Sequence, residues 1–279
     1  MNGKKWICLA AALGAGYASG SEIVLFYAQL GRAAHLAALI AAAIYAGFGL
    51  LCVRLKRDTG ADNLPLALRR RMGAGAGQAA ALLHLAAMAI AALRSVNMAG
   101  RIAEILLPAQ QAYIVGAGIC VLLAAALARD RGAAGAIWIF ACVLGALFLM
   151  LGGRSVKSGL SHVQLLIEDS IPAAVLSGAL HGSMLCAVTG SAMLDAAHDE
   201  KSALCAGGAL FCMLEIAYLC MKSAGKNVLS LRQPLIAMAA AWGSAGQIAV
   251  SILMISGAAL TLRVCVRGTI RIVRERREL

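Results

Sequence analysis

The sequence predicts an all-α polytopic membrane protein with about eight transmembrane helices. Of its 279 residues 61% are hydrophobic and 14% are charged, whereas a soluble domain carries roughly a quarter charged residues. The apolar residues form long runs, each near the ~20 residues that cross a hydrocarbon core as a helix. A transmembrane β-barrel would instead show alternating segments of ~10 residues with aromatic rims, and only 5% of this chain is aromatic.

Eight apolar runs predict the spans, and short clusters of charged residues separate them. We expect helices near residues 5–31, 33–53, 76–100, 112–128, 133–152, 172–194, 203–221 and 245–262. Residues 1–262 then form one transmembrane domain, and residues 263–279 form a basic cytoplasmic tail. Arginines recur on one helical face of this tail, which predicts an interfacial helix on the inner leaflet.

The net charge of +12 does not indicate nucleic-acid binding, because the basic residues lie at the ends of apolar runs. There they set orientation and meet anionic lipid. With both termini in the cytoplasm, most of the 25 basic residues fall on the inner side. The stretch 195–201 fits this orientation least, because it carries Asp195, Asp199 and Glu200 against one lysine.

The most informative stretch is residues 14–22, GAGYASGSE, in the middle of the first predicted span. Its three glycines weaken a helix, and unwound backbone inside a bilayer is tolerated only where protein or a water-filled cavity satisfies it. Ser19 and Glu22 also fit a capping box that would start a second half-helix. The alternative is that the small residues only permit close helix packing. The binding-site interpretation takes in Gly14, Ala15, Gly16, Tyr17, Ala18, Ser19, Gly20 and Glu22.

A polar stripe in the third predicted span suggests an intramembrane charge network. Arg94, Asn97, Arg101 and Glu104 lie within about 80° of one another on a helix of 3.6 residues per turn. Arg101 and Glu104 are expected to pair locally or snorkel near the outer interface. Arg94 lies deeper, and its candidate partners are Glu22 and Glu215.

Enzymatic motifs do not occur in a credible context. The chain has no glycine-rich phosphate loop with a lysine, no His-Glu-x-x-His and no serine elbow. We therefore expect neither an enzyme nor a cofactor.

The stretch GAGYASGSE, followed by Phe26, Gly31 and Arg32, resembles the first helix of the YkvI-like membrane proteins. These are bacterial relatives of the amino acid–polyamine–organocation transporters. The resemblance implies a LeuT-type fold in the bacterial cytoplasmic membrane, with a first repeat at about 5–152 and an incomplete second, inverted repeat at about 172–262. About two further helices would then be missing: either a homodimer or another membrane protein covers the gap, or these helices were peripheral and were lost.

The resemblance also implies where a solute and an ion would bind. The sixth span carries three glycines and would unwind like the first, which adds Ser177, Gly178, His181 and Ser183 to the site. Sodium would lie near Gly16, Ser256 and Thr261, although Ala258 and Ala259 stand where relatives carry adjacent threonines. The alternative coupling ion is a proton bound by His181, because histidine changes its charge near neutral pH.

Together these patterns predict an ion-coupled carrier of a small, amino-acid-like solute that works by alternating access. The solute carboxylate is expected at the start of a half-helix. The competing hypothesis is a membrane sensor or an assembly subunit that kept part of a transporter fold without transporting.

Overall fold

The computed structural model describes residues 12, 14, 17, 20–107, 110–129, 143–152, 170–196, 199–222 and 233–274. Every element within these residues is helical. The elements are α3 (Ser21–Phe26), η1 (Ala28–Ala33), α4 (Ala34–Thr59), α5 (Leu64–Met72), α6 (Ala74–Leu106), α7 (Ala112–Arg129), the helix Val143–Gly152, α9 (Ile171–Ala196), α10 (Glu200–Lys222), α12 (Pro234–Ala239), η2 (Ala240–Trp242) and α13 (Gly243–Arg274).

Five segments of the described chain are long and apolar enough to cross a membrane. They are Ala28–Thr59, Ala74–Leu106, Ile171–Ala196, Glu200–Lys222 and Pro234–Arg274. They contain the spans expected at 33–53, 76–100, 172–194, 203–221 and 245–262. The spans expected at 112–128 and 133–152 correspond to the shorter apolar helices Ala112–Leu127 and Val143–Gly152, and residues 133–142 lie outside the described residues.

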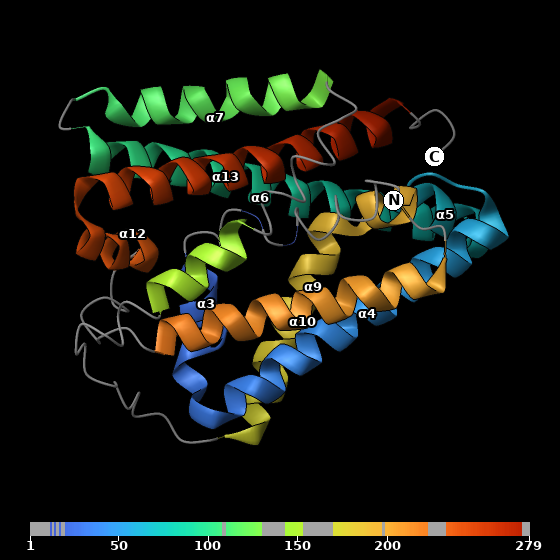
Figure 1. Cartoon of the computed structure of the whole chain (residues 1–279). Helices are drawn as coiled ribbons and strands as arrows, with labels where there is room; N and C mark the ends of the chain where they lie inside the picture. The colour runs from blue at the N-terminus through green and yellow to red at the C-terminus, as the bar shows by residue number, and fades with distance from the viewer. Residues whose placement is uncertain are drawn as a thin grey trace.

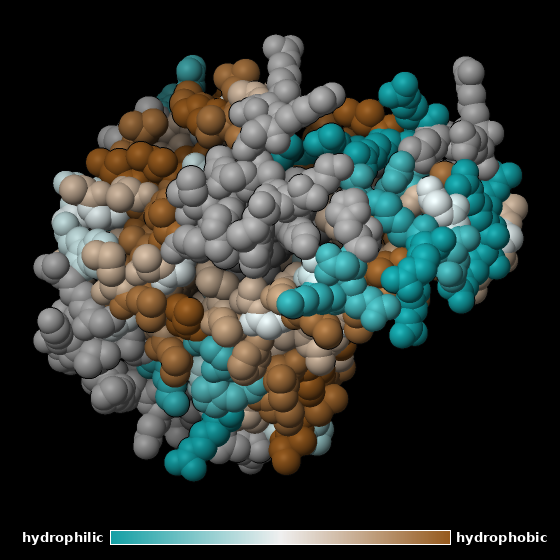
Figure 2. Space-filling view, turned by 45° about the vertical axis from the view of Figure 1, so that its right-hand side comes forward, coloured by the Kyte–Doolittle hydropathy of each residue, from teal (hydrophilic) through white to brown (hydrophobic). Residues whose placement is uncertain are grey.

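The outer surface of these helices is apolar. Leu83 on α6 and Leu122 on α7 are each more than 70% exposed, and exposed leucines and isoleucines recur on α4, α9, α10 and α13. Figure 2 shows hydrophobic residues over much of the molecule, with hydrophilic residues gathered mainly at its right-hand end. A surface of this kind needs lipid rather than water around it, so the protein is a multi-pass helical membrane protein.

The long helices form two groups. In the first, which we call the α4 bundle, α4 packs extensively against α9 and α10. In the second, the α6 bundle, α6 packs against α5, α7 and α13. The helices α6, α7 and α13 lie side by side in the upper part of Figure 1, and α4 and α10 lie alongside one another below them. Contacts between the bundles are fewer and run mainly through α6 with α9.

The first predicted span is not a continuous rod. Gly20 has φ +76° and precedes α3, which is only six residues long. Tyr27 then leaves helical geometry, and Gly31 interrupts the following 3-10 turn with φ +54°. The helix cap differs from the prediction, because α3 starts after Gly20 without a side-chain cap, so Glu22 does not complete a capping box. Ser19 lies outside the described residues.

The second predicted break is wrong. The helix α9 runs from Ile171 to Ala196 without interruption. Its glycines serve packing instead: a Cβ on Gly178 would lie 2.4 Å from the Ala37 carbonyl oxygen, and one on Gly182 would lie 2.9 Å from that of Ala41. Glycines four residues apart let the α9 backbone approach α4 closely, as in small-xxx-small interfaces.

The last helix also differs from expectation, because α13 continues through Leu262 to Arg274. Cys265, Gly268 and Ile272 are buried, and a Cβ on Gly268 would lie 2.5 Å from the Met88 sulfur on α6. The described part of the basic tail therefore starts as a packed extension of the last span. The sequence pattern also missed α5, whose start is capped by the Asn63 side chain accepting from the Leu66 N–H.

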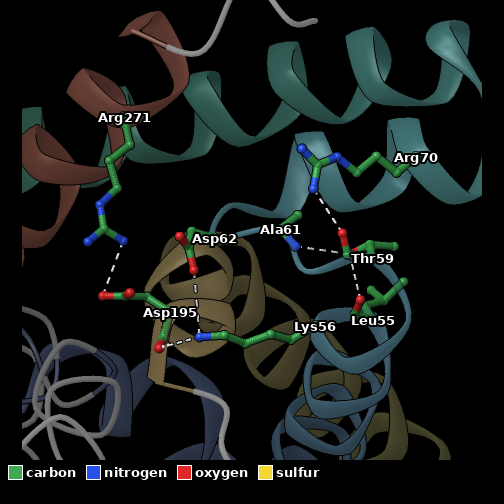
Figure 3. Close-up of polar contacts among 8 residues, drawn as sticks. All are labelled: Leu55, Lys56, Thr59, Ala61, Asp62, Arg70, Asp195 and Arg271. Atoms are coloured by element: carbon green, nitrogen blue, oxygen red, sulfur yellow. Dashed lines mark hydrogen bonds and ion pairs between the residues drawn. The ribbon is translucent and has the colours of Figure 1, made fainter.

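Charged side chains from distant segments meet at one end of the molecule, which we call the charged end. Its members are Lys56, Arg57, Asp58, Asp62, Arg70, Arg71, Asp195, Glu200 and Arg271. Figure 3 shows Asp195 between Lys56 and Arg271. The Arg271 guanidinium lies 3.1 Å from the Asp195 carboxylate, and Lys56 donates to the Asp195 carbonyl oxygen at 2.8 Å. Asp195 and Glu200 thus have basic partners from α13 and α4.

Candidate functional site

A cavity of about 950 Å³ lies where the two bundles face one another, and we call it the central cavity. Its wall is formed by α3, α6, α9, α12 and α13. Along α6 the lining runs from Ala87, near the middle of the helix, to Ile105, near its C-terminal end. Polar side chains in the lining are Ser21, Glu22, Arg94, Ser95, Asn97, Arg101, Glu104, Gln233, Gln247 and Thr261.

An ion pair joins α6 to α3, which packs against α10 and α9 of the α4 bundle. Arg94 Nη2 on α6 lies 3.2 Å from Glu22 Oε1 on α3. The Glu22 side chain is only 10% exposed, whereas that of Arg94 is 51% exposed to the cavity side. Of the two partners predicted for Arg94, the structure selects Glu22. A charge held this deep is tolerated because its counter-charge is beside it.

His181 on α9 lies directly behind Glu22. Its Nε2 atom is 3.7 Å from Glu22 Oε2, and its side chain is 1% exposed. The Tyr27 hydroxyl is within hydrogen-bonding distance of His181 Nδ1, and the Phe26 ring stacks on the imidazole with centroids 4.7 Å apart. His181 Nε2 has no hydrogen-bond partner among the described residues. Ser177, one turn earlier, donates to the Phe26 carbonyl oxygen and so fixes the broken first span against α9.

The outer part of the polar stripe is engaged locally, as the sequence predicted. Arg101 pairs with Glu104 at 3.0 Å, and both side chains are exposed, so the cavity reaches the surface at this end of α6. Tyr113 on α7 donates to Asn97 Oδ1 and lies under the Arg101 guanidinium. These contacts hold the stripe in place against α7.

Glu215 does not belong to the same charge network. Its Oε2 lies 2.6 Å from His35 Nδ1, at the start of α4. The neighbouring Tyr218 hydroxyl donates to the Gly31 carbonyl oxygen at the kink of the first span. The predicted group of Arg94, Arg101 and Glu215 therefore divides into three separate pairs, with Glu22, Glu104 and His35 as the partners.

The hydroxyls proposed for sodium are not brought together. Thr261 lines the central cavity, but Ser256 does not, because five residues along a helix turn the side chains to different faces. Both hydroxyls donate to carbonyl oxygens of their own helix, those of Ile252 and Gly257. No group of three or more His, Cys, Asp or Glu side chains suited to a metal ion occurs within the described residues.

The other predicted site residues take varied positions. Gly14 lines the cavity, Gly178 packs against α4, and Ser183 is exposed. Tyr17 is buried, donates to the Met213 carbonyl oxygen and meets the Phe148 ring edge-on. Ala15, Gly16, Ala18 and Ser19 lie outside the described residues.

Beyond the central cavity, the space between the bundles is closed on the side of the charged end. His84 on α6 is within 2.7 Å of the Ala187 carbonyl oxygen on α9, and the cluster of Met88, Cys265 and Ile272 packs with Val188 of α9. A small cavity of about 40 Å³ lies there, lined by residues that include Ser191, Asp195 and Arg271. Within the described residues, the central cavity is open at the end near Arg101 and Glu104, and α6 and α9 are in contact on the side of the charged end.

Sequence reasoning missed several side chains of this site. Phe26 stands four residues after Glu22, which places it on the same face of a helix, but nothing in the sequence pairs Tyr27 with His181. Gln247 offers a signal, because an amide side chain is unusual within a predicted span. Gln233 precedes Pro234, a position that reads as an ordinary loop residue.

No family model, no curated protein and no solved structure matches the chain.

Proposed function

We propose that the protein is an ion-coupled secondary transporter of a small, amino-acid-like solute across the bacterial cytoplasmic membrane. The observation that supports this most is the Glu22–Arg94 ion pair in the wall of a 950 Å³ cavity between two helical bundles. A paired charge at membrane depth in contact with a cavity is typical of a solute pathway.

The two charges suit a zwitterion. Arg94 presents planar donors for a carboxylate, and Glu22 presents an acceptor for an ammonium group. A solute that carries both groups can replace each partner of the ion pair by its own charge, so that neither protein charge is left alone. The remaining lining is mostly apolar, with residues such as Ile90 and Leu185, and leaves room for an apolar side chain.

The two bundles provide the moving parts. With both termini cytoplasmic, the open end of the cavity faces outward and the charged end faces the cytoplasm. Rocking of the α6 bundle against the α4 bundle would close the first and open the second, as in carriers built from repeats. The site is then formed around the broken first span alone, since α9 is continuous. The resemblance to YkvI-like proteins and a LeuT-like arrangement of eight spans belong to this proposal.

The test is solute flux in proteoliposomes. Purified protein is reconstituted, a panel of radiolabelled amino acids is offered under imposed sodium or proton gradients, and uptake is compared with that of empty liposomes. Gradient-driven uptake of at least one solute supports the carrier. Binding without flux, or no flux together with stable copurification of another membrane protein, would support the sensor or subunit hypothesis instead.

Breaking the Asp195–Arg271 ion pair at the charged end is expected to open the proposed pathway on the cytoplasmic side. Asp195→Asn removes the charge that attracts Arg271, whose side chain is 28% exposed; such pairs contribute roughly 1 kcal/mol, or about fivefold in an equilibrium. In a variant that keeps only Cys265 of the nine cysteines, Asp195→Asn should speed maleimide labelling of Cys265 by about two- to fivefold. Arg71→Gln, which breaks the exposed Arg71–Asp58 pair, is the control. Equal rates in both variants would contradict a gating role for Asp195.

A further inference from the structure

His181 differs from a buried histidine that only supports packing, because its Nε2 atom has no hydrogen-bond partner among the described residues. A buried histidine that only supports packing normally satisfies both ring nitrogens, as His84 does by contacting the Ala187 carbonyl oxygen and the Ser191 N–H. His181 satisfies only Nδ1, through Tyr27. Its Nε2 is directed at Glu22 Oε2 across 3.7 Å, too far for a hydrogen bond and close enough for an ion pair.

We propose that His181 and Glu22 together bind the proton whose gradient drives transport; this inference rests on the carrier function proposed above. Glu22 lies between the central cavity and His181, so its carboxylate can pass a proton from the cavity to Nε2. The two carboxylate oxygens have different partners, with Oε1 facing Arg94 and Oε2 facing His181. One carboxylate therefore joins the solute site to the proton site.

The geometry gives the coupling a direction. While His181 is neutral, Glu22 and Arg94 satisfy one another, and a solute must break their pair. When Nε2 carries a proton, Glu22 gains a second cationic partner through Oε2, which weakens its attraction for Arg94 and lets the guanidinium bind a solute carboxylate. The solute and one proton then bind together, so a lower pH on the open side strengthens solute binding. Release of the proton on the cytoplasmic side restores the Glu22–Arg94 pair and expels the solute.

The groups around His181 are consistent with this role. From α3 and η1 it meets Glu22, Phe26 and Tyr27, and from α6 the nearest charge is Arg94, held by Glu22. From α10, Glu215 is paired with His35 of α4. A solute carboxylate that engages Arg94 balances the positive charge nearest to the proton site. Protonation and solute binding thus favour one another.

The experiment compares His181→Asn with His35→Asn. Asn keeps a polar atom near the Nδ1 position for Tyr27 but cannot carry the proton. In proteoliposomes, His181→Asn should lose accumulation driven by a proton gradient, by at least tenfold, while solute exchange without a gradient continues at a reduced rate. His35→Asn breaks the other histidine–glutamate pair of the α4 bundle and should retain proton-driven accumulation.

A measurement on the unmodified protein makes the test independent of folding in the variants. Solute is added to purified protein in weakly buffered detergent with a pH dye, and uptake of about one proton per bound solute is expected. The proposed proton site is wrong if the protein binds and exchanges solute with no proton uptake. It is also wrong if folded His181→Asn accumulates solute as well as the unmodified protein does. Either result leaves the carrier proposal intact. If the unmodified protein neither binds nor moves any solute, the carrier proposal itself fails.

Discussion

Replacing Arg94 by Gln is expected to lower solute uptake at subsaturating concentration by roughly 30- to 1000-fold, which corresponds to about 2 to 4 kcal/mol of lost binding free energy. Two effects add up: the solute carboxylate loses its cation, and the Glu22 carboxylate, 10% exposed, loses its partner. Glu22→Gln should reduce uptake by a similar factor, because the ammonium group and Arg94 then lack an anion. Radiolabelled uptake in proteoliposomes measures both.

Two further variants separate charge from geometry and from general disturbance. Arg94→Lys keeps the charge but not the planar fork of donors and should fall between the unmodified protein and Arg94→Gln. Arg57→Gln removes an exposed charge that pairs with Glu200 at 3.9 Å and should change uptake by less than about twofold. If folded Arg94→Gln takes up solute as well as the unmodified protein does, the ion pair is not part of the solute site, and the carrier proposal loses its main support.

Five of the eight predicted spans coincide with helices long and apolar enough to cross a membrane, because each depends on a local property. A run of ~20 apolar residues has few alternatives to a membrane helix, and the closest agreement is for 172–194 within Ile171–Ala196 and 203–221 within Glu200–Lys222. The same reasoning fails where the hydropathy drops but the helix continues. The arginines after Leu262 suggested a separate tail, yet α13 continues because Gly268 and Ile272 still pack inside the protein.

Glycines were the hardest residues to interpret, because one residue type serves two opposite purposes. Gly20 and Gly31 have positive φ and interrupt the first span. Gly178 and Gly182 remain helical and bring two backbones together. The sequence shows how the glycines are spaced, but it does not show which helix packs against them. For Gly178 and Gly182, the position of α4 decides between unwinding and close packing.

The candidate site was predictable to the extent that it lies on one helix face. The stripe of Arg94, Asn97, Arg101 and Glu104 follows from helical periodicity, and the structure places all four on the cavity. Pairing between helices depends on rotation about each axis, which no local pattern fixes. Hence Glu22 was one of two equal candidates for Arg94, and the His35–Glu215 pair was not foreseen.

The second large effect is expected at Gly178. A Cβ there would lie 2.4 Å from the Ala37 carbonyl oxygen and 3.0 Å from the Ala37 Cα, so the α4 or α9 backbone must move. Gly178→Ala should therefore destabilise the protein by roughly 1 to 3 kcal/mol, the usual cost of overpacking, despite the better helix propensity of alanine. Reversible unfolding in mixed micelles, followed by circular dichroism, measures the loss.

Two adjacent glycines on α10 provide the controls. Gly207 and Gly208 are adjacent on α10, but a Cβ on Gly207 would lie 2.5 Å from the Ala46 Cβ, whereas nothing lies within 4 Å of one on Gly208. Gly207→Ala should destabilise the protein, and Gly208→Ala should leave it unchanged or add up to about 1 kcal/mol. If Gly178→Ala instead matched Gly208→Ala in stability but lost transport, α9 would have to unwind at Gly178 during the cycle, and the packing role assigned to that glycine would be overturned.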